Sequence, residues 1–253
     1  MFTKVGAGFT WTAISADHRP RPEGPRKLSL YHAGMKFQAV LFDCDGVLVD
    51  SEAITNGVLR DMLEESGWSL TPAQCMAQFV GKAVLDERLL IESRTGRPLT
   101  EEWLLSFRER RNEGLVAALQ PIDNAVTSVA RIHAQYAGRI ACASGADRFK
   151  VEMQLDMCGL MPYFKGNIFS GHEMPRSKPA PDVYLAAAAA LGVDPRHCAV
   201  VEDTVTGVTA GVAAGATVFG YSPSATGHGS PEALLAAGAR FVFTDMGALA
   251  DLV

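Results

Sequence analysis

Residues 37–51 read FQAVLFDCDGVLVDS, and this stretch decides the fold of the chain. Its first part, Phe37 to Phe42, is a short apolar run of the kind that forms a buried strand in a parallel sheet. The run ends at two acidic residues, Asp43 and Asp45, followed by Gly46. We therefore expect a buried parallel strand that presents Asp43 at its carboxyl end.

Beyond residue 120 the sequence alternates between helical and strand-like segments. This alternation predicts an α/β fold, in which right-handed crossovers place helices on both faces of a parallel sheet. The expected strands after the first are 139–143, 167–169, 198–201 and 216–219. Helices are expected over 123–134, 146–157, 181–191 and 204–214, with a final helix, strand and helix from Pro231 onwards. Ligands bind at the carboxyl ends of the strands in such a sheet, so we expect the chemistry there.

Residues 51–119, between the first strand and the alternating part, contain helical patterns only. Ser51 is a candidate cap of the first helix, and Thr71 and Pro72 open the second, with proline in its first turn. Two more helices are expected around 84–95 and 100–119. Because no strand-like alternation appears, we interpret this block as a helical domain inserted into an α/β core. The predicted catalytic core comprises 35–50 and 120–253. The predicted helical cap comprises 51–119, and the predicted N-terminal tail comprises 1–34.

Composition narrows the class of protein further. The tail has an Arg- and Pro-rich run at 18–22 and no apolar period, so we interpret it as disordered or as an overextended start. Net charge is -5 and no dense Lys/Arg stripe is present, so nucleic acid is not an expected partner. The longest apolar stretches fall short of the roughly 20 residues that cross a bilayer, so no membrane association is expected. The 5 scattered cysteines form no Cys-x-x-Cys pair, which favours a reduced, cytoplasmic setting.

Two pairs of acidic residues each follow a predicted strand. Asp43 and Asp45 can bring both carboxylates near one point if the chain turns at Gly46. One carboxylate can then attack phosphorus to form an acyl phosphate while the other transfers protons. Glu202 and Asp203 end another apolar strand, and beside the first pair they would repel it without a cation. Because Mg²⁺ prefers oxygen ligands, we expect a magnesium site, although a capped turn and a helix N-terminus are simpler interpretations of each pair alone.

Two further segments offer groups that suit a phosphate. Lys178 is followed by prolines at 179 and 181, which fix the backbone around it, so this cation can offset the charges of Asp43 and of a phosphoryl group. Ser144 and Gly145 follow another predicted strand, where a hydroxyl and backbone N–H groups can hold phosphate oxygens. A simple helix cap at Ser144 is compatible with the same pattern.

The order and spacing of these four segments closely resemble the haloacid dehalogenase superfamily, in its branch with a helical cap after the first motif. The resemblance spans Phe37 to the C-terminus and implies a Rossmann-like doubly wound parallel sheet core with an inserted α-helical cap domain. It implies Mg²⁺ as the cofactor and an aspartyl-phosphate intermediate. It implies that Asp43 is the nucleophile and Asp45 the general acid/base. It also implies that Ser144 and Lys178 bind the phosphoryl group, and that the metal ligands are Asp43, Asp45, Glu202 and Asp203. Further substrate contacts are expected from Gly145, Ser51 and Lys82.

Similar in appearance are the β-phosphoglucomutase-like proteins and the sugar-phosphate phosphatases, including those similar to 6-phosphogluconate phosphatase. β-Phosphoglucomutases carry a histidine five residues after the acid that corresponds to Asp50, and a phosphate-gripping arginine in the cap loop. Thr55 and Val84 stand at these places here. We therefore expect a phosphatase acting on a small sugar or sugar-acid phosphate. The alternatives are a β-phosphoglucomutase-type phosphomutase and, less favoured, a non-catalytic metal-binding or interaction protein; the oligomeric state is left open. Because Asp45 is present, dehalogenase and phosphonoacetaldehyde hydrolase chemistry is not expected.

Overall fold

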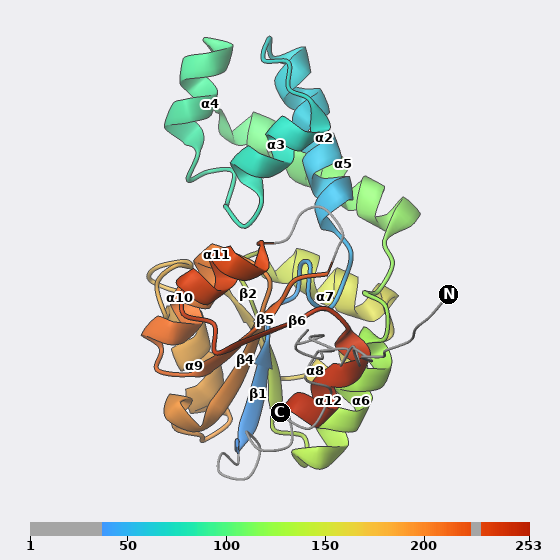
Figure 1. The fold of residues 1–253 in the computed structure, drawn as a ribbon. Coiled ribbons are helices and arrows are strands. Elements are labelled where there is room, and N and C mark those ends of the chain that lie inside the picture. The colour runs from blue at the N-terminus through green and yellow to red at the C-terminus, as the bar shows by residue number, and fades with distance from the viewer. Residues whose placement is uncertain (1–36, 224–228) are drawn as a thin grey trace, which may run out of the picture. The chain divides into compact units, whose positions relative to one another are not determined.

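A wholly parallel sheet in the order β3-β2-β1-β4-β5-β6 forms the centre of the computed structural model (Figure 1). The structure describes residues 37–223 and 229–253, so the predictions for the tail, 1–34, lie outside the described residues. The strands are β1 Ala39–Phe42, β2 Ile140–Ser144, β3 Ile168–Ser170, β4 Cys198–Glu202, β5 Thr217–Tyr221 and β6 Phe241–Phe243. Because β1 is central, the residue that follows it lies at the middle of the carboxyl edge of the sheet.

Alternate residues of β1 pack into two separate apolar layers. Val40 and Phe42 belong to one layer, and Ala39 and Leu41 belong to the other, as the period of two along a strand requires. The helices of the first layer are α6 Ala125–Gln135, α7 Arg148–Met157, α8 Met161–Phe164 and α12 Leu249–Leu252. Those of the second are α9 Asp182–Ala190, α10 Val205–Ala213 and α11 Pro231–Ala236. Helices therefore cover both faces of the sheet, and the predicted doubly wound α/β fold is confirmed.

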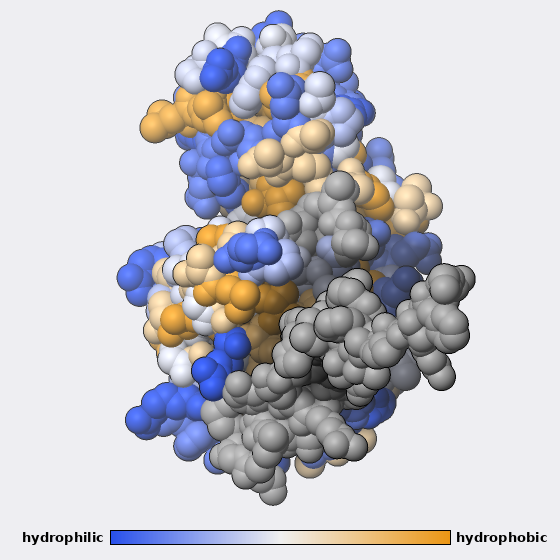
Figure 2. Space-filling model, viewed as in Figure 1, coloured by the Kyte–Doolittle hydropathy of each residue, from blue (hydrophilic) through white to orange (hydrophobic). Residues whose placement is uncertain are grey.

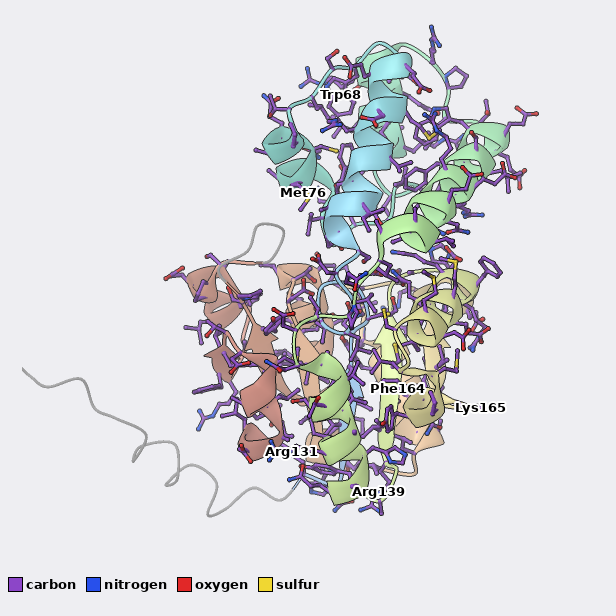
Figure 3. The ribbon with its side chains drawn as sticks, turned by 90° about the vertical axis from the view of Figure 1, so that its right-hand side faces the viewer. Trp68, Met76, Arg131, Arg139, Phe164 and Lys165 are labelled. Carbon is purple, nitrogen blue, oxygen red and sulfur yellow. The ribbon has the colours of Figure 1, made fainter. Side chains whose placement is uncertain are left out.

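Four helices separate β1 from α6 and have an apolar cluster of their own (Figure 1). They are α2 Glu52–Glu65, α3 Pro72–Phe79, α4 Arg88–Thr95 and α5 Glu101–Ala118. Leu63, Phe79 and Phe107 are among the residues buried in this cluster. In the side view, Trp68, in the connection from α2 to α3, and Met76, on α3, lie in this part of the chain, whereas Arg139 lies at the end of the sheet away from them (Figure 3). We call α2 to α5, with their connections, the helical insertion.

Local sequence explains where the helices of the insertion begin. Thr71 forms a capping box with Gln74 at the start of α3, as the Thr-Pro pair predicts. Ser51 occupies the position before α2, but its hydroxyl makes no capping bond and donates to the carboxylate of Asp45 instead. Ser51 is therefore the N-cap residue of α2 by position, as predicted, but its hydroxyl does not cap the helix, because a buried carboxylate competes for the hydroxyl. The helix expected from 84 begins only at Arg88, since the preceding residues form turns with bonds to the third residue back.

The two connections between the insertion and the core run side by side. Val49 pairs with Pro121 in an antiparallel bridge. The N–H of Asp50 donates to the carbonyl of Gln120 at 2.9 Å, and the N–H of Ile122 donates to the carbonyl of Leu48 at 3.1 Å. The chain therefore leaves the core and returns to it at one place, next to the carboxyl end of β1.

The visible face mixes hydrophilic and hydrophobic residues over both the insertion and the core (Figure 2). Over residues 37–223 and 229–253, no helix has the length and the apolar character to cross a bilayer.

Candidate active site

Asp43 follows the central strand and lies beside a buried lysine. Its N–H donates to the carbonyl of Val201 on β4 at 3.0 Å, which fixes the backbone at this point. The ammonium of Lys178 donates to Oδ1 of Asp43 at 2.6 Å and to Oε1 of Glu202 at 2.7 Å. Because Lys178 is nearly fully buried between these two carboxylates, it is held as a fixed cation, as predicted from its flanking prolines.

Glu202 is held by hydrogen bonds on both carboxylate oxygens. Oε1 accepts from Lys178 and from the hydroxyl of Tyr184 at 2.8 Å. Oε2 accepts from the backbone of Asp203 at 3.0 Å and from the backbone and hydroxyl of Thr204, both at 3.2 Å. Glu202 therefore positions Lys178 whether or not it also binds a metal.

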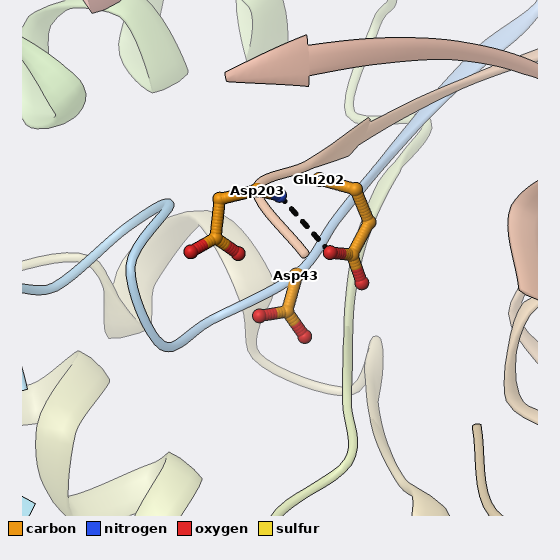
Figure 4. A group of neighbouring side chains, drawn as sticks. All are labelled: Asp43, Glu202 and Asp203. Atoms are coloured by element: carbon orange, nitrogen blue, oxygen red, sulfur yellow. Dashed lines mark hydrogen bonds between the residues drawn. The ribbon is translucent and has the colours of Figure 1, made fainter. Parts of the chain in front are cut away.

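Three buried carboxylates form a group that suits a metal ion (Figure 4). Asp43, Glu202 and Asp203 each offer an oxygen, and these oxygens lie within 4.8 Å of one another. Burial is the main cause that raises the pKa of Asp43 to about 7; Lys178 opposes it, and Glu202 adds to it. Burial, Glu202 and Asp43 also raise the pKa of Asp203 well above its usual range. A hard divalent cation relieves this repulsion, and all of the donors are oxygens, so the group fits such an ion.

The carboxylate of Asp45 is not a member of this group, although the sequence predicted four metal-binding acids. Its Oδ1 accepts from the ammonium of Lys150 at 2.7 Å, from the amide of Gln154 at 2.9 Å and from Ser51. Burial alone would raise the pKa of Asp45, but the charge and hydrogen bonds of these partners outweigh burial and lower the pKa to about 2. Asp45 is therefore ionised, and its carboxylate is held by Lys150, Gln154 and Ser51.

A cavity of about 470 Å³ opens over these groups and is lined by both the core and the insertion. The predicted site residues that line this cavity are Asp43, Asp45, Ser144, Gly145, Lys178, Glu202 and, from the insertion, Lys82. Its volume is within the range of small-molecule sites. The expectation that Ser51 contacts substrate is corrected, because Ser51 is fully buried behind Asp45 and does not line the cavity.

Two of the phosphate-binding candidates have modest local roles. The hydroxyl of Ser144 accepts from the N–H of Ala146 at 3.0 Å and remains at the cavity wall. The cap of α7 is Asp147, whose carboxylate accepts from the N–H of Lys150 at 3.0 Å, so Ser144 is not the helix cap. Lys82 pairs with Glu87 at 3.1 Å in the loop before α4.

Several residues in or beside the cavity were not found from the sequence. Lys150 and Gln154 of α7 hold Asp45, and Arg108 and Arg111 of α5 line the wall that the insertion provides. Glu52, at the start of α2, also lines the cavity, where burial and the charge of Asp45 raise its pKa to about 8. The spacing of four residues between Lys150 and Gln154 places both on one face of α7, but hydrophobic periodicity does not mark that face as buried.

Gly207, in the first turn of α10, leaves room for Glu202. A Cβ at this position would lie 1.7 Å from Oε1 of Glu202, which is far inside contact distance. We predict that Gly207→Ala displaces Glu202 and with it Lys178, and that kcat falls by roughly 10²-fold, the effect of a misplacement of about 1 Å. The matched control is Gly57→Ala in α2, where a Cβ meets nothing within 4 Å. Measuring kcat and the melting temperature of both variants checks this, and equal kcat values would contradict it.

Comparison with known proteins places the chain in a family. The family model for haloacid dehalogenase-like hydrolases matches residues 37–215. The 6-phosphogluconate phosphatase of Escherichia coli K12 is 29% identical over 185 residues, which cover 73% of this chain and 82% of the relative. Hexitol phosphatase B of the same organism is 28% identical over 183 residues, covering 70% of this chain and 79% of the relative.

Solved structures agree with this match. A conserved haloacid dehalogenase-like protein from Agrobacterium tumefaciens is 32% identical with a TM-score of 0.73, covering 85% of this chain and 97% of that one. A hydrolase of the same family from Deinococcus radiodurans, with bound phosphate and sodium, is 32% identical with a TM-score of 0.69, covering 86% and 98%. The chain belongs to the haloacid dehalogenase-like hydrolases, and the predicted enzyme class, a phosphoric monoester hydrolase, is confirmed.

Proposed function

We propose that this chain is a Mg²⁺-dependent phosphatase that hydrolyses a small sugar or sugar-acid phosphate through an aspartyl-phosphate at Asp43. The observation that carries the proposal is the place of Asp43: it ends the central strand, contacts Lys178 at 2.6 Å, lies in a cluster of three carboxylates and lines the cavity. Phosphatases are among the curated relatives, which supports the same class of substrate.

The first half of the proposed reaction forms the phosphoenzyme. An oxygen of Asp43 attacks phosphorus, and the bond between phosphorus and the ester oxygen breaks. Lys178 and the N–H groups near Ser144 and Gly145 stabilise the charge on the phosphoryl oxygens. A proton must reach the leaving oxygen, and Asp45 is the candidate donor; because it is ionised in the described arrangement, it must first leave Lys150 and take up a proton from solvent.

The second half releases inorganic phosphate. The ionised carboxylate of Asp45 accepts a proton from water, the water oxygen attacks phosphorus, and the bond from phosphorus to Asp43 breaks. The low pKa keeps Asp45 unprotonated at neutral pH but also makes it a weak base, so Asp45 must leave Lys150 to gain basicity before it accepts this proton.

The metal-holding residues in this proposal are Asp43, Glu202 and Asp203. A bound Mg²⁺ supplies positive charge that neutralises the phosphoryl oxygens and keeps neighbouring carboxylates ionised. The raised pKa of Asp43 shows why a cation is needed: without one, a large share of Asp43 is protonated near neutral pH and is a poor nucleophile.

The helical insertion is proposed to act as a cap that excludes water and selects the substrate. Thr55 and Val84 both line the cavity, so the two positions that differ from β-phosphoglucomutases face the proposed substrate. Neither side chain can supply a cation for a second phosphate or an imidazole for proton control. Hydrolysis is therefore favoured over transfer between positions of one sugar.

A hydrolysis screen tests the proposed function. We expect release of inorganic phosphate from sugar or sugar-acid phosphates, loss of activity with EDTA and recovery with Mg²⁺, and poor support by Ca²⁺, whose coordination is looser. β-Glucose 1-phosphate with a trace of glucose 1,6-bisphosphate is the comparison for the mutase. Glucose 6-phosphate formed much faster than free phosphate would favour the mutase, and no reaction with any ester would favour a non-catalytic protein.

A further inference from the structure

Helix α5 presents two arginines to the cavity from the side of the insertion. Arg108 and Arg111 are three residues apart and so share a helix face, which also carries Leu104 and Phe107. The cavity has a volume of about 470 Å³. This is more than a phosphoryl group alone occupies, so the arginines lie where the remainder of a substrate would fit.

The other cations of the cavity already have counter-ions. Lys150 pairs with Asp45 at 2.7 Å, and Lys178 pairs with Asp43 at 2.6 Å. Arg111 pairs with Asp147 of the core at 3.1 Å, and Lys82 with Glu87 at 3.1 Å.

Arg108 differs from these four cations. Among the described residues that line the cavity, it is the cation for which the structure gives no ion pair or hydrogen bond. The Arg108 side chain is partly buried, so solvent screens its charge less than it would at a fully exposed position.

The remaining acids of the cavity do not neutralise Arg108. Glu52 accepts from the amide of Asn56 at 3.0 Å, and its raised pKa leaves it largely protonated at neutral pH. Asp86 is exposed and forms no ion pair with Arg108 in the part of the chain that the structure describes.

His172, opposite α5, is sensitive to this positive charge. Desolvation is the main cause that lowers its pKa; Asp147 opposes the shift, and Arg108 and Arg111 add to it. Both arginines therefore lie close enough to His172 to act on its charge.

We propose that Arg108 binds a carboxylate of the substrate, and that the substrate is the phosphate ester of a sugar acid. This inference rests on the proposed phosphatase function and narrows its substrate class. The guanidinium fork of arginine matches a carboxylate with two parallel hydrogen bonds. A single unpaired guanidinium balances the single charge of a carboxylate, whereas a second phosphate, with nearly two charges, would require a further free cation.

Two substrates that differ only in the proposed contact provide the test. 6-Phosphogluconate and D-glucitol 6-phosphate have the same chain, but the first ends in a carboxylate and the second in a hydroxymethyl group. The wild-type enzyme is expected to have the higher kcat/KM for the acid. Arg108→Ala should lower the ratio of kcat/KM for acid over alcohol by about tenfold to a hundredfold, as expected for a lost charged hydrogen bond. Arg108→Lys should retain part of this preference, because lysine keeps the charge but not the fork.

The matched control is Arg110→Ala in the same helix. Arg110 points away from the cavity and pairs with Glu65 at 2.7 Å, so its loss should leave the ratio unchanged. Binding of 6-phosphogluconate to Asp43→Asn, with and without Arg108→Ala, measures the contact without turnover; we expect the second change to weaken binding about tenfold or more.

The outcomes separate this inference from the proposed function. If Arg108→Ala lowers kcat/KM equally for both substrates, or binding to the Asp43→Asn protein is unchanged, the carboxylate contact is wrong. If a sugar bisphosphate shows the dependence on Arg108 and the sugar acid does not, the inference is overturned in favour of a second phosphate. If the wild-type enzyme hydrolyses no ester, p-nitrophenyl phosphate included, the phosphatase proposal fails, while the binding measurement still decides the role of Arg108.

Discussion

Replacing Asp43 with asparagine is expected to reduce hydrolysis below detection. An amide cannot form the acyl phosphate, so the first bond to phosphorus is never made. The fold should persist, because asparagine has nearly the same shape and its carbonyl can still accept from Lys178, which lies 2.6 Å from Oδ1 of Asp43. Loss of one buried charge also removes the cost of burying it, which is the main cause that raises the pKa of Asp43. The measurement is phosphate release together with acid-stable labelling of the protein by a radioactive phosphate ester.

The control for this variant is Asp61→Asn. Asp61 is an exposed carboxylate on α2 that pairs with Arg60 and does not line the cavity, so the same chemical change there should have no effect on turnover. Near-native hydrolysis by the Asp43→Asn protein would show that a different group attacks phosphorus.

Replacing Asp45 with asparagine is expected to lower kcat by about 10² to 10⁴-fold, the usual contribution of a proton-transfer group. Because Asp45 is ionised in the described arrangement, we expect its replacement to slow the second half-reaction, in which it acts as the base, more than the first. With p-nitrophenyl phosphate, whose leaving group needs no proton, the phosphoenzyme should form and then accumulate. Rapid-quench labelling measures its formation and decay separately.

Lys150→Met provides the comparison for Asp45. It removes the cation 2.7 Å from Oδ1 but keeps the carboxylate, so the pKa of Asp45 should rise and the phosphoenzyme should decay more slowly only at low pH. An Asp45→Asn phosphoenzyme that decays at the wild-type rate would remove Asp45 from the second step.

The sheet and the first contacts of the site were predictable because they depend on local pattern. Apolar runs that end in Asp43 and Glu202 specify parallel strands, and neighbouring parallel strands bring their carboxyl ends to one edge. The contact between Lys178 and Asp43 follows from this convergence. The boundaries of α4 were predicted less well, since turns and helix starts share similar residues before Arg88.

Lys150 and Gln154 were not predicted because a lysine in a helix is exposed in most proteins. Here Phe149 is 67% exposed while Lys150 is only 5% exposed, the reverse of the order that hydrophobicity favours. The inversion has a physical reason: the charge of Lys150 is required at Asp45, and that partner comes from a strand about a hundred residues earlier. Hydrophobic periodicity does not detect such long-range ion pairs.

Arg108 and Arg110 illustrate the same limit in the insertion. Both belong to one charged run, Arg108 to Arg111, and the sequence does not indicate which of them lines a cavity. Only the rotation of α5 directs Arg108 to the cavity and Arg110 to Glu65. That rotation depends on the packing of Phe107 and Leu115, which belong to different apolar clusters.

The paired connections at Val49 and Pro121 give the helical insertion the character of an exchangeable module. Its two ends lie side by side and hydrogen-bond to each other, so the whole insertion is joined to the core in the way that a single hairpin loop would be. Replacing or lengthening the insertion therefore need not alter the strand register or move Asp43. In evolution, and in protein engineering, a new preference for substrate can be acquired by changing α2 to α5 while the phosphoryl-transfer groups of the core are inherited unchanged.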